Sequence, residues 1–373
     1  MSRGPDAREA AGRFEFGGPV LDVAAYGNGN VNDTFLATSG AGVPKRFILQ
    51  RINTRVFRRP ELIMRNLRVL ADHVRKRTGV SPFGEVRRWE LPLVVPAKDG
   101  KDYWTGTDGS FWRALSFIEG SRSYETVRDL DHAKEVGFAL GLFHRLISDL
   151  PVKELSDTLE GFHVTPLYLR HFDEVLAQTR PARSPEIDYA LDFIGQRRAL
   201  AGILEQAKAS GRLFDRPIHG DPKVNNVMID TQTGRAVSMI DLDTVKPGLV
   251  HYDIGDCLRS CCNPLGETAE PIEAVRFDTG VCKAVLGGYL SMAAGFLTEN
   301  DYEHFYDAIR LIPFELGLRF FTDYLEGDGY FKTRYKEHNL DRALVQFKLT
   351  ESIESRAAEI RTIIADLSPA LPG

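Results

Sequence analysis

The spacing of apolar residues changes once along the chain, and this change limits the folds that the chain can adopt. Up to residue 118, short runs of β-forming residues are separated by glycine, asparagine and aspartate turns. From residue 130 on, apolar residues recur every three or four positions over long segments, which is the spacing of one helix face. The chain is therefore predicted to have an α+β fold, with a small antiparallel β-rich lobe followed by a larger, mainly helical lobe.

The same patterns predict the individual elements. The first lobe is expected to contain strands at 21–26, 33–38, 45–51, 91–96, 102–105 and 111–118, and one helix at 60–77. The second lobe is expected to contain helical segments at 130–149, 185–209, 270–297, 301–325 and 341–367. A hinge near 116–121 divides the chain into predicted domains 1–118 and 119–373. The polar N-terminal stretch MSRGPDAREAAGRF is expected to be a frayed tail.

Composition narrows the classes of partner. The 373 residues are 43% hydrophobic and 27% charged, which is enough apolar material for a large core. A net charge of −5 argues against a general nucleic-acid partner. No apolar run reaches the roughly 18–20 residues that cross a bilayer, so no membrane partner is expected. The four cysteines lack the paired spacing of structural zinc, which favours buried thiols in the cytoplasm.

Two short runs interrupt the helical pattern of the second lobe. They are IHGDPKVNNVMID at 218–230 and VSMIDLDTVKPG at 237–248. Asp221 follows an apolar strand on a loop, where a carboxylate can accept a proton from a hydroxyl group. Asn226 and Asp241 stand at the same end of two strands that can pair as a hairpin, and their oxygens suit Mg²⁺. The pattern predicts a metal beside a base, although either acid alone could merely cap a turn.

The run HGDPKVNN followed by IDLD resembles the catalytic core of the aminoglycoside phosphotransferase and choline kinase family, relatives of protein kinases. A closer resemblance is to N-acetylhexosamine 1-kinases, through YGNGNVNDTF, FILQRIN, LEGFHVTP, IDLDTVKPG and ELGLRFFTDYLEGDGYFK. The resemblance implies a protein-kinase-like bilobal fold, ATP and Mg²⁺ as cofactors, and a small-molecule acceptor, an amino sugar phosphorylated at its anomeric hydroxyl. It also implies that Asp221 is the catalytic base and that Asn226 and Asp241 bind magnesium.

Several neighbours of this core are assigned supporting roles by the same resemblance. His219 is expected to brace the catalytic loop, and Asp253 resembles an aspartate that hydrogen-bonds that loop, as Asp256 could also do. Two roles stay open for Asp243, which either contacts metal or water or braces its loop. Lys223 either neutralises the transferring phosphoryl group or is a solvated loop lysine.

The nucleotide is expected to bind against the first lobe. Its phosphates would meet a turn with two glycines and three short polar residues, Gly27, Asn28, Gly29, Asn30 and Asn32. Adenine would meet the hinge residues Ser116, Phe117 and Ile118. Protein kinases place a lysine on the third strand, paired with a helix glutamate. Here Gln50 or Arg51 must take that place, and Arg51 is favoured because a guanidinium binds phosphate oxygens. The following helix has Arg65 and Asn66 where a glutamate would be expected, and its Glu61 lies very early.

Two segments are candidates for the acceptor pocket. One contributes His163, and the other contributes Arg319, Asp323 and Tyr330. Sugars need several hydrogen bonds and an apolar floor, which these residues can supply together. The alternative is an ordinary surface ion pair between Arg319 and Asp323, worth under about 1 kcal/mol. An acidic second lobe keeps aminoglycoside kinases open, and choline and homoserine kinases are alternatives of the same enzyme class. A nucleotide-binding scaffold without turnover also stays open, because the usual lysine–glutamate pair is missing.

Overall fold

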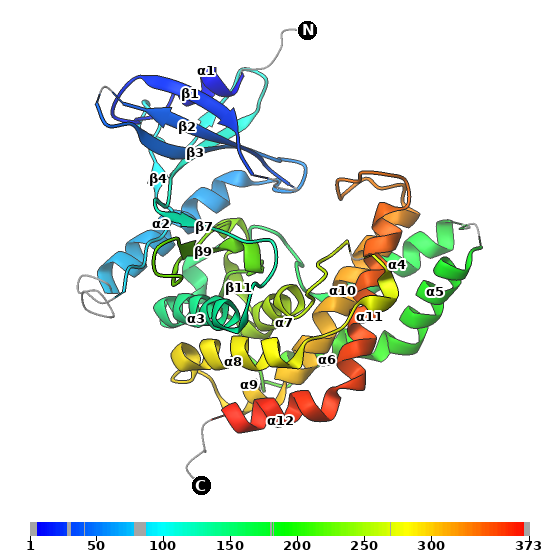
Figure 1. Cartoon of the computed structure of the whole chain (residues 1–373). Coiled ribbons are helices and arrows are strands. Elements are labelled where there is room, and N and C mark those ends of the chain that lie inside the picture. The colour runs from blue at the N-terminus through cyan, green and yellow to red at the C-terminus, as the bar shows by residue number, and fades with distance from the viewer. Residues whose placement is uncertain are drawn as a thin grey trace.

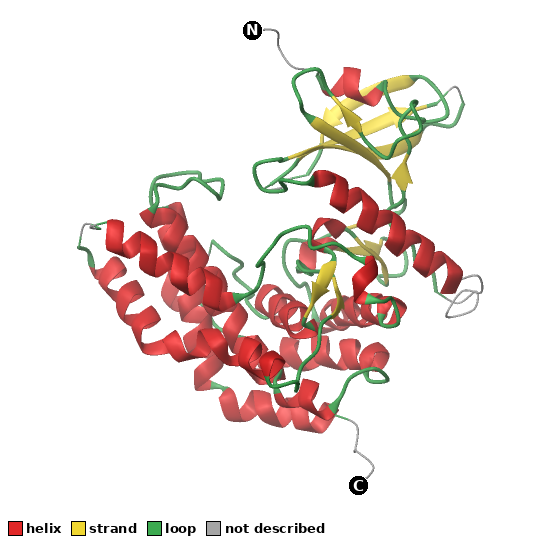
Figure 2. Ribbon diagram, turned by 180° about the vertical axis from the view of Figure 1, so that it is seen from behind, coloured by secondary structure: helices red, strands yellow, loops and turns green. Residues whose placement is uncertain are grey.

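The computed structural model describes residues 6–27, 31–40, 42–77, 87–179, 181, 183–268 and 270–368. It has two lobes, a small one built on an antiparallel sheet and a larger one built of helices (Figure 1). The predicted α+β, two-lobed architecture is therefore confirmed. Seen from behind, strands dominate the upper lobe and helices the lower lobe, with a few short strands between them (Figure 2).

The N-lobe is organised around one six-stranded sheet. Its strands are β1 (Val20–Ala25), β2 (Asp33–Ser39), β3 (Lys45–Ile52), β4 (Val94–Val95), β5 (Trp104–Thr105) and β6 (Phe111–Ser116). They lie in the order β1-β2-β3-β6-β4, and β5 pairs with β6. Gln50 of β3 lies opposite Thr34 of β2 on one side and Arg113 of β6 on the other. The hairpin predicted around the glycine turn is confirmed, since β1 and β2 are antiparallel neighbours.

The two faces of this sheet have different cover. The outer face packs against α1 (Ala7–Ala11) through Leu49, Trp112 and the fully buried Ala10 and Ala11. The inner face carries Ile52 and joins the main core with α2 (Pro60–Arg77). The prediction of a frayed N-terminal tail is wrong for the residues of α1, because small alanines let that short helix lie flat on the sheet.

The C-lobe is a bundle of ten α-helices within the described residues. They are α3 (Leu130–Ile147), α4 (Thr165–Gln178), α5 (Pro185–Arg197), α6 (Ile203–Ala209), α7 (Val250–Cys261), α8 (Thr279–Ala293), α9 (Glu299–Glu303), α10 (Phe305–Leu325), α11 (His338–Ser355) and α12 (Ala357–Leu367). Helices α3 and α8 approach closely at Gly137, where a Cβ would lie 1.9 Å from the Val285 carbonyl oxygen. In the part of the chain that the structure describes, no helix is both long and apolar enough to cross a membrane.

Short strands at the top of the C-lobe position the two motif runs. β9 (Val227–Asp230) pairs antiparallel with β10 (Ala236–Met239) and also with β7 (Ser121–Arg122). β8 (Arg216–Ile218) pairs with β11 (Lys246–Gly248). The predicted hairpin is confirmed: beyond it, the Ile240 N–H donates to the Asn226 carbonyl at 2.9 Å. Asn226 and Asp241 therefore leave the hairpin at the same end.

Candidate active site

The loop that carries Asp221 is held by a buried carboxylate. Asp253 of α7 accepts hydrogen bonds from the backbone N–H groups of His219 at 2.6 Å and Gly220 at 2.8 Å. Burial alone would raise the pKa of Asp253, but the hydrogen bond and charge of His144 hold it below its ordinary value. An ionised carboxylate thus fixes two consecutive amides, which is the loop-bracing role predicted for Asp253.

Gly220 and His219 make the sharp turn before Asp221 possible. Gly220 has a φ of +88°, and a Cβ there would lie 2.6 Å from the Thr244 carbonyl oxygen, so a side chain would be both strained and obstructed. The His219 ring is buried, with Nε2 3.0 Å from the Ile240 carbonyl oxygen and Nδ1 3.3 Å from the Asp221 backbone nitrogen. His219 therefore ties the Asp221 loop to the end of β10, which is the bracing role predicted for it.

Asp221 is oriented by two neighbours on its own loop. Lys223 Nζ lies 2.9 Å from Asp221 Oδ2, and Asn226 Nδ2 donates to the Asp221 carbonyl oxygen at 2.7 Å. Burial raises the pKa of the Asp221 carboxyl, and the charge of Asp256 adds to the rise, although Lys223 opposes it. A carboxylate with a raised pKa is a better proton acceptor, which suits a general base.

Asp241 lies directly after the hairpin, at the start of the turn Leu242–Thr244. Its φ of 61° is left-handed, a conformation that aspartate tolerates better than most residues. Asp241 is exposed at the protein surface. Partial desolvation by the surrounding protein atoms, with the charges of Asp243 and Asp221, nevertheless raises the pKa of its carboxyl to about 7. A divalent cation at this position would relieve the repulsion among these acids.

The predicted metal ligands are brought together by the hairpin and suit a hard cation. Asn226 is buried, and its Nδ2 donates to Asp221, so Oδ1 is the atom that a cation would contact. Within the described ranges, no three His, Cys, Asp or Glu side chains group to hold a metal by themselves. Two protein oxygens fit Mg²⁺ that is shared with phosphates and water, the usual arrangement for this ion.

Asp243 does not face open solvent. Arg113 Nη2 lies 2.5 Å from its Oδ1, and Asn32 Nδ2 donates to its Oδ2 at 2.8 Å. The side chain is only 3% exposed. Of the two roles left open for Asp243, bracing fits this geometry. Asn32, predicted beside the phosphates, is buried in the same cluster.

Arg51 and Gln50 lie on opposite faces of β3. Arg51 is 49% exposed on the outer face and pairs with Asp33 at 2.6 Å. Gln50 is on the inner face, where its Oε1 accepts from Arg113 Nε at 2.9 Å and Nη2 at 2.7 Å. This geometry corrects the preference for Arg51 as the phosphate anchor, because neighbouring strand residues point to opposite faces. Of the predicted glycine turn, Asn28, Gly29 and Asn30 lie outside the described residues, and Gly27 has a φ of +73° with open space around it.

Glu61 in the first turn of helix α2 pairs with Arg59 and not with β3, and Asn66 has a different role. The side chain of Asn66 donates to the carbonyl oxygens of Val245 and Ser156, both at 2.8 Å, and accepts from the Ser156 N–H at 2.9 Å. Asn66 thus fixes α2 to C-lobe backbone. A buried cation does lie beside β3, namely Arg113 of β6, which sequence reasoning missed. The sequence feature that could have identified Arg113 is its position inside the apolar strand FWRALS.

The hinge residues border an apolar cluster. β6 ends at Ser116, and the ring of Phe117 makes an edge-on contact with Tyr26 at 6.0 Å between centroids. Ile118 packs with Met228 of β9. Apolar side chains from both lobes therefore meet beside the hinge backbone, where adenine is predicted to bind.

His163 lies behind the catalytic loop. It has a φ of 67°, and its ring is 4% exposed, with Nδ1 3.0 Å from Glu315 Oε1 and Nε2 2.9 Å from the Gly220 carbonyl oxygen. Burial would lower the pKa of His163, but the charge of Glu315 raises it above its ordinary value. Both ring nitrogens are engaged, so the predicted acceptor contact of His163 is corrected to a bracing role.

Arg319 of α10 is surrounded by aromatic rings. Its guanidinium carbon lies 5.0 Å from the ring centroids of Phe162 and Tyr168, and its nearest carboxylate is Glu315, at 3.9 Å. The alternative of a surface ion pair with Asp323 is not what the structure shows. Arg319 keeps hydrogen-bonding capacity beside an aromatic floor, as an acceptor site requires.

Asp323 shapes the loop after α10 instead. Its two carboxylate oxygens accept from the backbone N–H groups of Tyr330 at 2.8 Å and Phe331 at 3.0 Å, and from Asn339 Nδ2 at 2.9 Å. The expectation that Asp323 contacts the acceptor is corrected, since these bonds occupy it. The loop, orange in Figure 1, projects from the helical lobe and carries Tyr330, whose side chain stays exposed.

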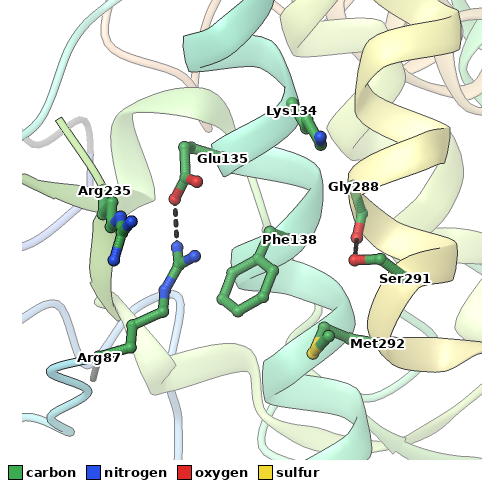
Figure 3. A pocket seen from close by; sticks show the side chains of 8 residues that line it. All are labelled: Arg87, Lys134, Glu135, Phe138, Arg235, Gly288, Ser291 and Met292. Carbon is green, nitrogen blue, oxygen red and sulfur yellow. Dashed lines mark hydrogen bonds and ion pairs between the residues drawn. The ribbon is translucent and has the colours of Figure 1, made fainter. Parts of the chain in front are cut away.

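A cavity of about 530 Å³ lies elsewhere, between α3 and α8 (Figure 3). Its lining includes Arg87, Lys134, Phe138 and Met292, and the drawn ion pair joins Arg87 to Glu135. The predicted site residues do not line it. The chemistry of the Asp221 loop, and not the size of a hollow, therefore identifies the candidate active site.

The chain is similar to known proteins. The model of the "Phosphotransferase enzyme family" matches residues 22–293. An aminoglycoside phosphotransferase from Alicyclobacillus acidocaldarius subsp. acidocaldarius has a similar structure, at 15% identity and a TM-score of 0.64, over 98% of each chain. So has a microcompartment-associated aminopropanol kinase, at 15% identity and a TM-score of 0.63, over 95% of this chain and 98% of that one.

A third similar structure is an amicoumacin kinase in complex with AMP-PNP, Ca²⁺ and its ligand, at 15% identity and a TM-score of 0.55, over 93% of each chain. At such identities the likeness establishes the fold. The protein-kinase-like, two-lobed fold predicted from the sequence is confirmed.

Proposed function

As the chain belongs to the phosphotransferase enzyme family, we propose that it is an ATP- and Mg²⁺-dependent kinase acting on the anomeric hydroxyl of an N-acetylhexosamine. One observation carries the proposal: Asp221, with a raised pKa and Lys223 at 2.9 Å, shares the end of one hairpin with Asn226 and Asp241. A base, a cation and two hard oxygen ligands are the parts that phosphoryl transfer needs.

In the proposed reaction, Asp221 orients the acceptor hydroxyl and takes its proton as the phosphoryl group arrives. An anomeric hydroxyl is more acidic than an ordinary alcohol, so a carboxylate suffices. Lys223, whose Nζ lies 2.9 Å from Asp221 Oδ2, balances the negative charge of the transferring phosphoryl group. Asn226 and Asp241 would hold Mg²⁺, which neutralises phosphate oxygens when bound.

We place the nucleotide between the lobes. The hinge Ser116–Ile118 would receive adenine, and the turn from Gly27 to Asn30 would lie over the phosphates. The domain boundary at 118/119 belongs to this proposal, since the hinge ends there. So does a cytoplasmic location, which suits a kinase of small metabolites with four buried, unpaired cysteines.

The proposed acceptor is a neutral sugar because three acids around the Asp221 loop, Asp256, Glu267 and Glu315, are each paired with an internal cation through at least one oxygen. Asp256 pairs with Arg259 at 2.7 Å, and Glu267 with Arg259 at 2.9 Å. Glu315 pairs with His163. A cationic acceptor would have to displace these internal partners. The Arg319 guanidinium can instead donate hydrogen bonds to sugar oxygens, and the Tyr330 hydroxyl can both donate to and accept from sugar hydroxyls.

Kinases of cationic acceptors are the second candidate, because the similar structures include an aminoglycoside phosphotransferase and an aminopropanol kinase. The charge of the acceptor distinguishes a kinase of neutral sugars from a kinase of cationic acceptors. A KM for the acceptor that is unchanged between low and high salt would favour the neutral sugar. A KM that rises steeply with salt would favour the cation.

The deciding experiment is an ADP-release assay. The panel holds N-acetylglucosamine, N-acetylgalactosamine, glucose, galactose, choline, homoserine and kanamycin, each with and without Mg²⁺. We expect magnesium-dependent turnover on an N-acetylhexosamine, with the product phosphate on carbon 1 by NMR. Turnover on another acceptor alone would refute the acceptor assignment, and ATP binding without any turnover would favour a silent scaffold.

A further inference from the structure

We propose that Arg113 and Asp243 form an interlobe latch that positions the nucleotide, in the place where the usual lysine–glutamate pair is missing. The inference rests on the proposed kinase function. It assigns Arg113 and Asp243 as positioning residues and not as ligands of the nucleotide or metal.

The latch is a chain of four side chains across the lobe boundary. Gln50 of β3 holds two nitrogens of Arg113, at 2.9 and 2.7 Å. Arg113 of β6 pairs with Asp243 of the C-lobe at 2.5 Å. The other carboxylate oxygen of Asp243 accepts from Asn32, which follows the glycine turn in sequence, at 2.8 Å. The sheet, the end of the phosphate turn and the C-lobe loop are thereby joined at one carboxylate.

The ion pair at the centre is out of contact with water. Arg113 is 1% exposed and Asp243 is 3% exposed. When one partner of such a pair is removed, the other is left as an uncompensated buried charge, so the pair resists opening. The orientation of the sheet relative to the Asp243 loop is therefore fixed more firmly than an exposed ion pair could fix it.

This loop also carries the proposed metal ligand. Asp241 precedes Asp243 by two residues, at the start of the single 3₁₀ turn Leu242–Thr244. The Asp243 carbonyl oxygen accepts from Thr158 Oγ1 at 2.7 Å, which fixes the turn from the C-lobe side. Arg113 thus sets the position of Asp241 relative to the sheet that covers the nucleotide.

A role for Asp243 as a magnesium ligand is disfavoured by the same contacts. Its Oδ1 forms the ion pair with Arg113, without a hydrogen bond, and its Oδ2 accepts from Asn32. Binding a cation would require Arg113 or Asn32 to withdraw. The two roles predict different results when Mg²⁺ is titrated.

The test compares Arg113→Gln, Asp243→Asn and the double variant with the wild type. Arg68→Gln is the matched control, because Arg68 is an N-lobe arginine in an exposed ion pair with Asp102. We measure Mg·AMP-PNP affinity by calorimetry, KM and kcat for Mg·ATP, and the Mg²⁺ concentration for half-maximal activity at saturating nucleotide. Each single variant is expected to raise the dissociation constant and KM about tenfold or more, since misplacement of bound groups has effects of this size. The KM for the acceptor and the Mg²⁺ requirement should stay within about twofold.

Because the two residues act as one unit, the double variant should be no worse than the worse single variant. Unchanged nucleotide affinity in both single variants, or effects that multiply in the double variant, would overturn the latch. A raised Mg²⁺ requirement in Asp243→Asn would make Asp243 a metal ligand and also overturn it. If Arg113→Gln fails to fold, the near-isosteric Asp243→Asn still decides. A wild type that does not bind Mg·AMP-PNP would refute the kinase function itself.

Discussion

The two faces of the N-lobe sheet each carry one arginine paired with an aspartate. The two ion pairs have similar lengths but differ in their exposure to water. On the outer face Arg51 is 49% exposed and lies 2.6 Å from Asp33. On the inner face Arg113 is 1% exposed and lies 2.5 Å from Asp243. Water screens the first pair, so its net worth is at most about 1 kcal/mol. The second pair stabilises a specific arrangement of the two lobes, because neither partner can be solvated alone. The face on which a charge lies, and not the charge itself, thus decides what it does.

The largest effect should come from the inward carboxylate that does the proposed chemistry. Asp221→Asn removes proton acceptance but keeps the shape of the loop, so kcat should fall about 10²- to 10⁴-fold. Nucleotide affinity should stay within about threefold, because positioning survives. Steady-state kinetics and calorimetry with Mg·AMP-PNP measure the two quantities. Asp33→Asn, on the outer face, is the control and should keep its kcat. A kcat near the wild-type value in Asp221→Asn would remove Asp221 as the base.

Substitution of the buried Arg113 should lower the free energy of unfolding more than substitution of the exposed Arg51. Arg113→Met leaves Asp243 as an unpaired buried charge, and the free energy of unfolding should drop by about 3–5 kcal/mol. Urea unfolding of Arg113→Met and of the double variant Arg113→Met/Asp243→Leu measures this. The double variant removes both charges and should recover much of the loss. A loss of under about 1 kcal/mol in Arg113→Met would mean that the pair is solvated and that the two faces are alike.

Asp241 should also make the stability of the fold depend on pH, which the exposed pair on the outer face should not. Asp241 has a folded-state pKa of about 7, above its ordinary value, so the folded protein holds a proton that the unfolded chain has lost. The stabilising contribution is complete at low pH and disappears as the pH rises through 7. Without metal, thermal stability should therefore decline between about pH 4 and 7 more than in Asp241→Asn. Scanning calorimetry across this range measures the difference. Equal slopes in the two proteins would show that Asp241 is not crowded by other carboxylates.

The same comparison explains which parts of the site were open to prediction from sequence. Asp221, Asn226 and Asp241 lie on one loop and one hairpin, so their spacing along the chain fixes their neighbourhood in space. Arg113 meets its partner Asp243 from 130 residues away, through the pairing of β3 with β6 and the docking of two lobes. Strand alternation places Gln50 and Arg51 on opposite faces of the sheet but does not say which of them faces the C-lobe.

Predictions from local composition were wrong in two further places, because they also depend on contacts between residues far apart in the sequence. The N-terminal segment is polar on average, yet Ala10 and Ala11 are fully buried because the outer face of the sheet needs cover. His163 and Asp323 are polar residues among glycines, which suggested a binding surface. Both instead satisfy buried or backbone groups, His163 at Gly220 and Asp323 at the loop after α10. Long-range packing, which sequence spacing does not encode, made these assignments.

The smallest effect should come from the outer arginine, and it is the sharpest check on the comparison. Arg51→Gln removes a positive charge one residue from Gln50, so any role of Arg51 at the phosphates would raise the KM for Mg·ATP. Because Arg51 lies on the face that carries Leu49 and Trp112, we expect KM and kcat to change by less than about twofold and stability by under about 1 kcal/mol. Gln50→Leu is the inward counterpart, since it deprives Arg113 of the acceptor that holds two of its nitrogens. If Arg51→Gln weakened nucleotide binding more than Gln50→Leu, the charge that serves the nucleotide would be on the outer face, and the inner latch would be a structural pair alone.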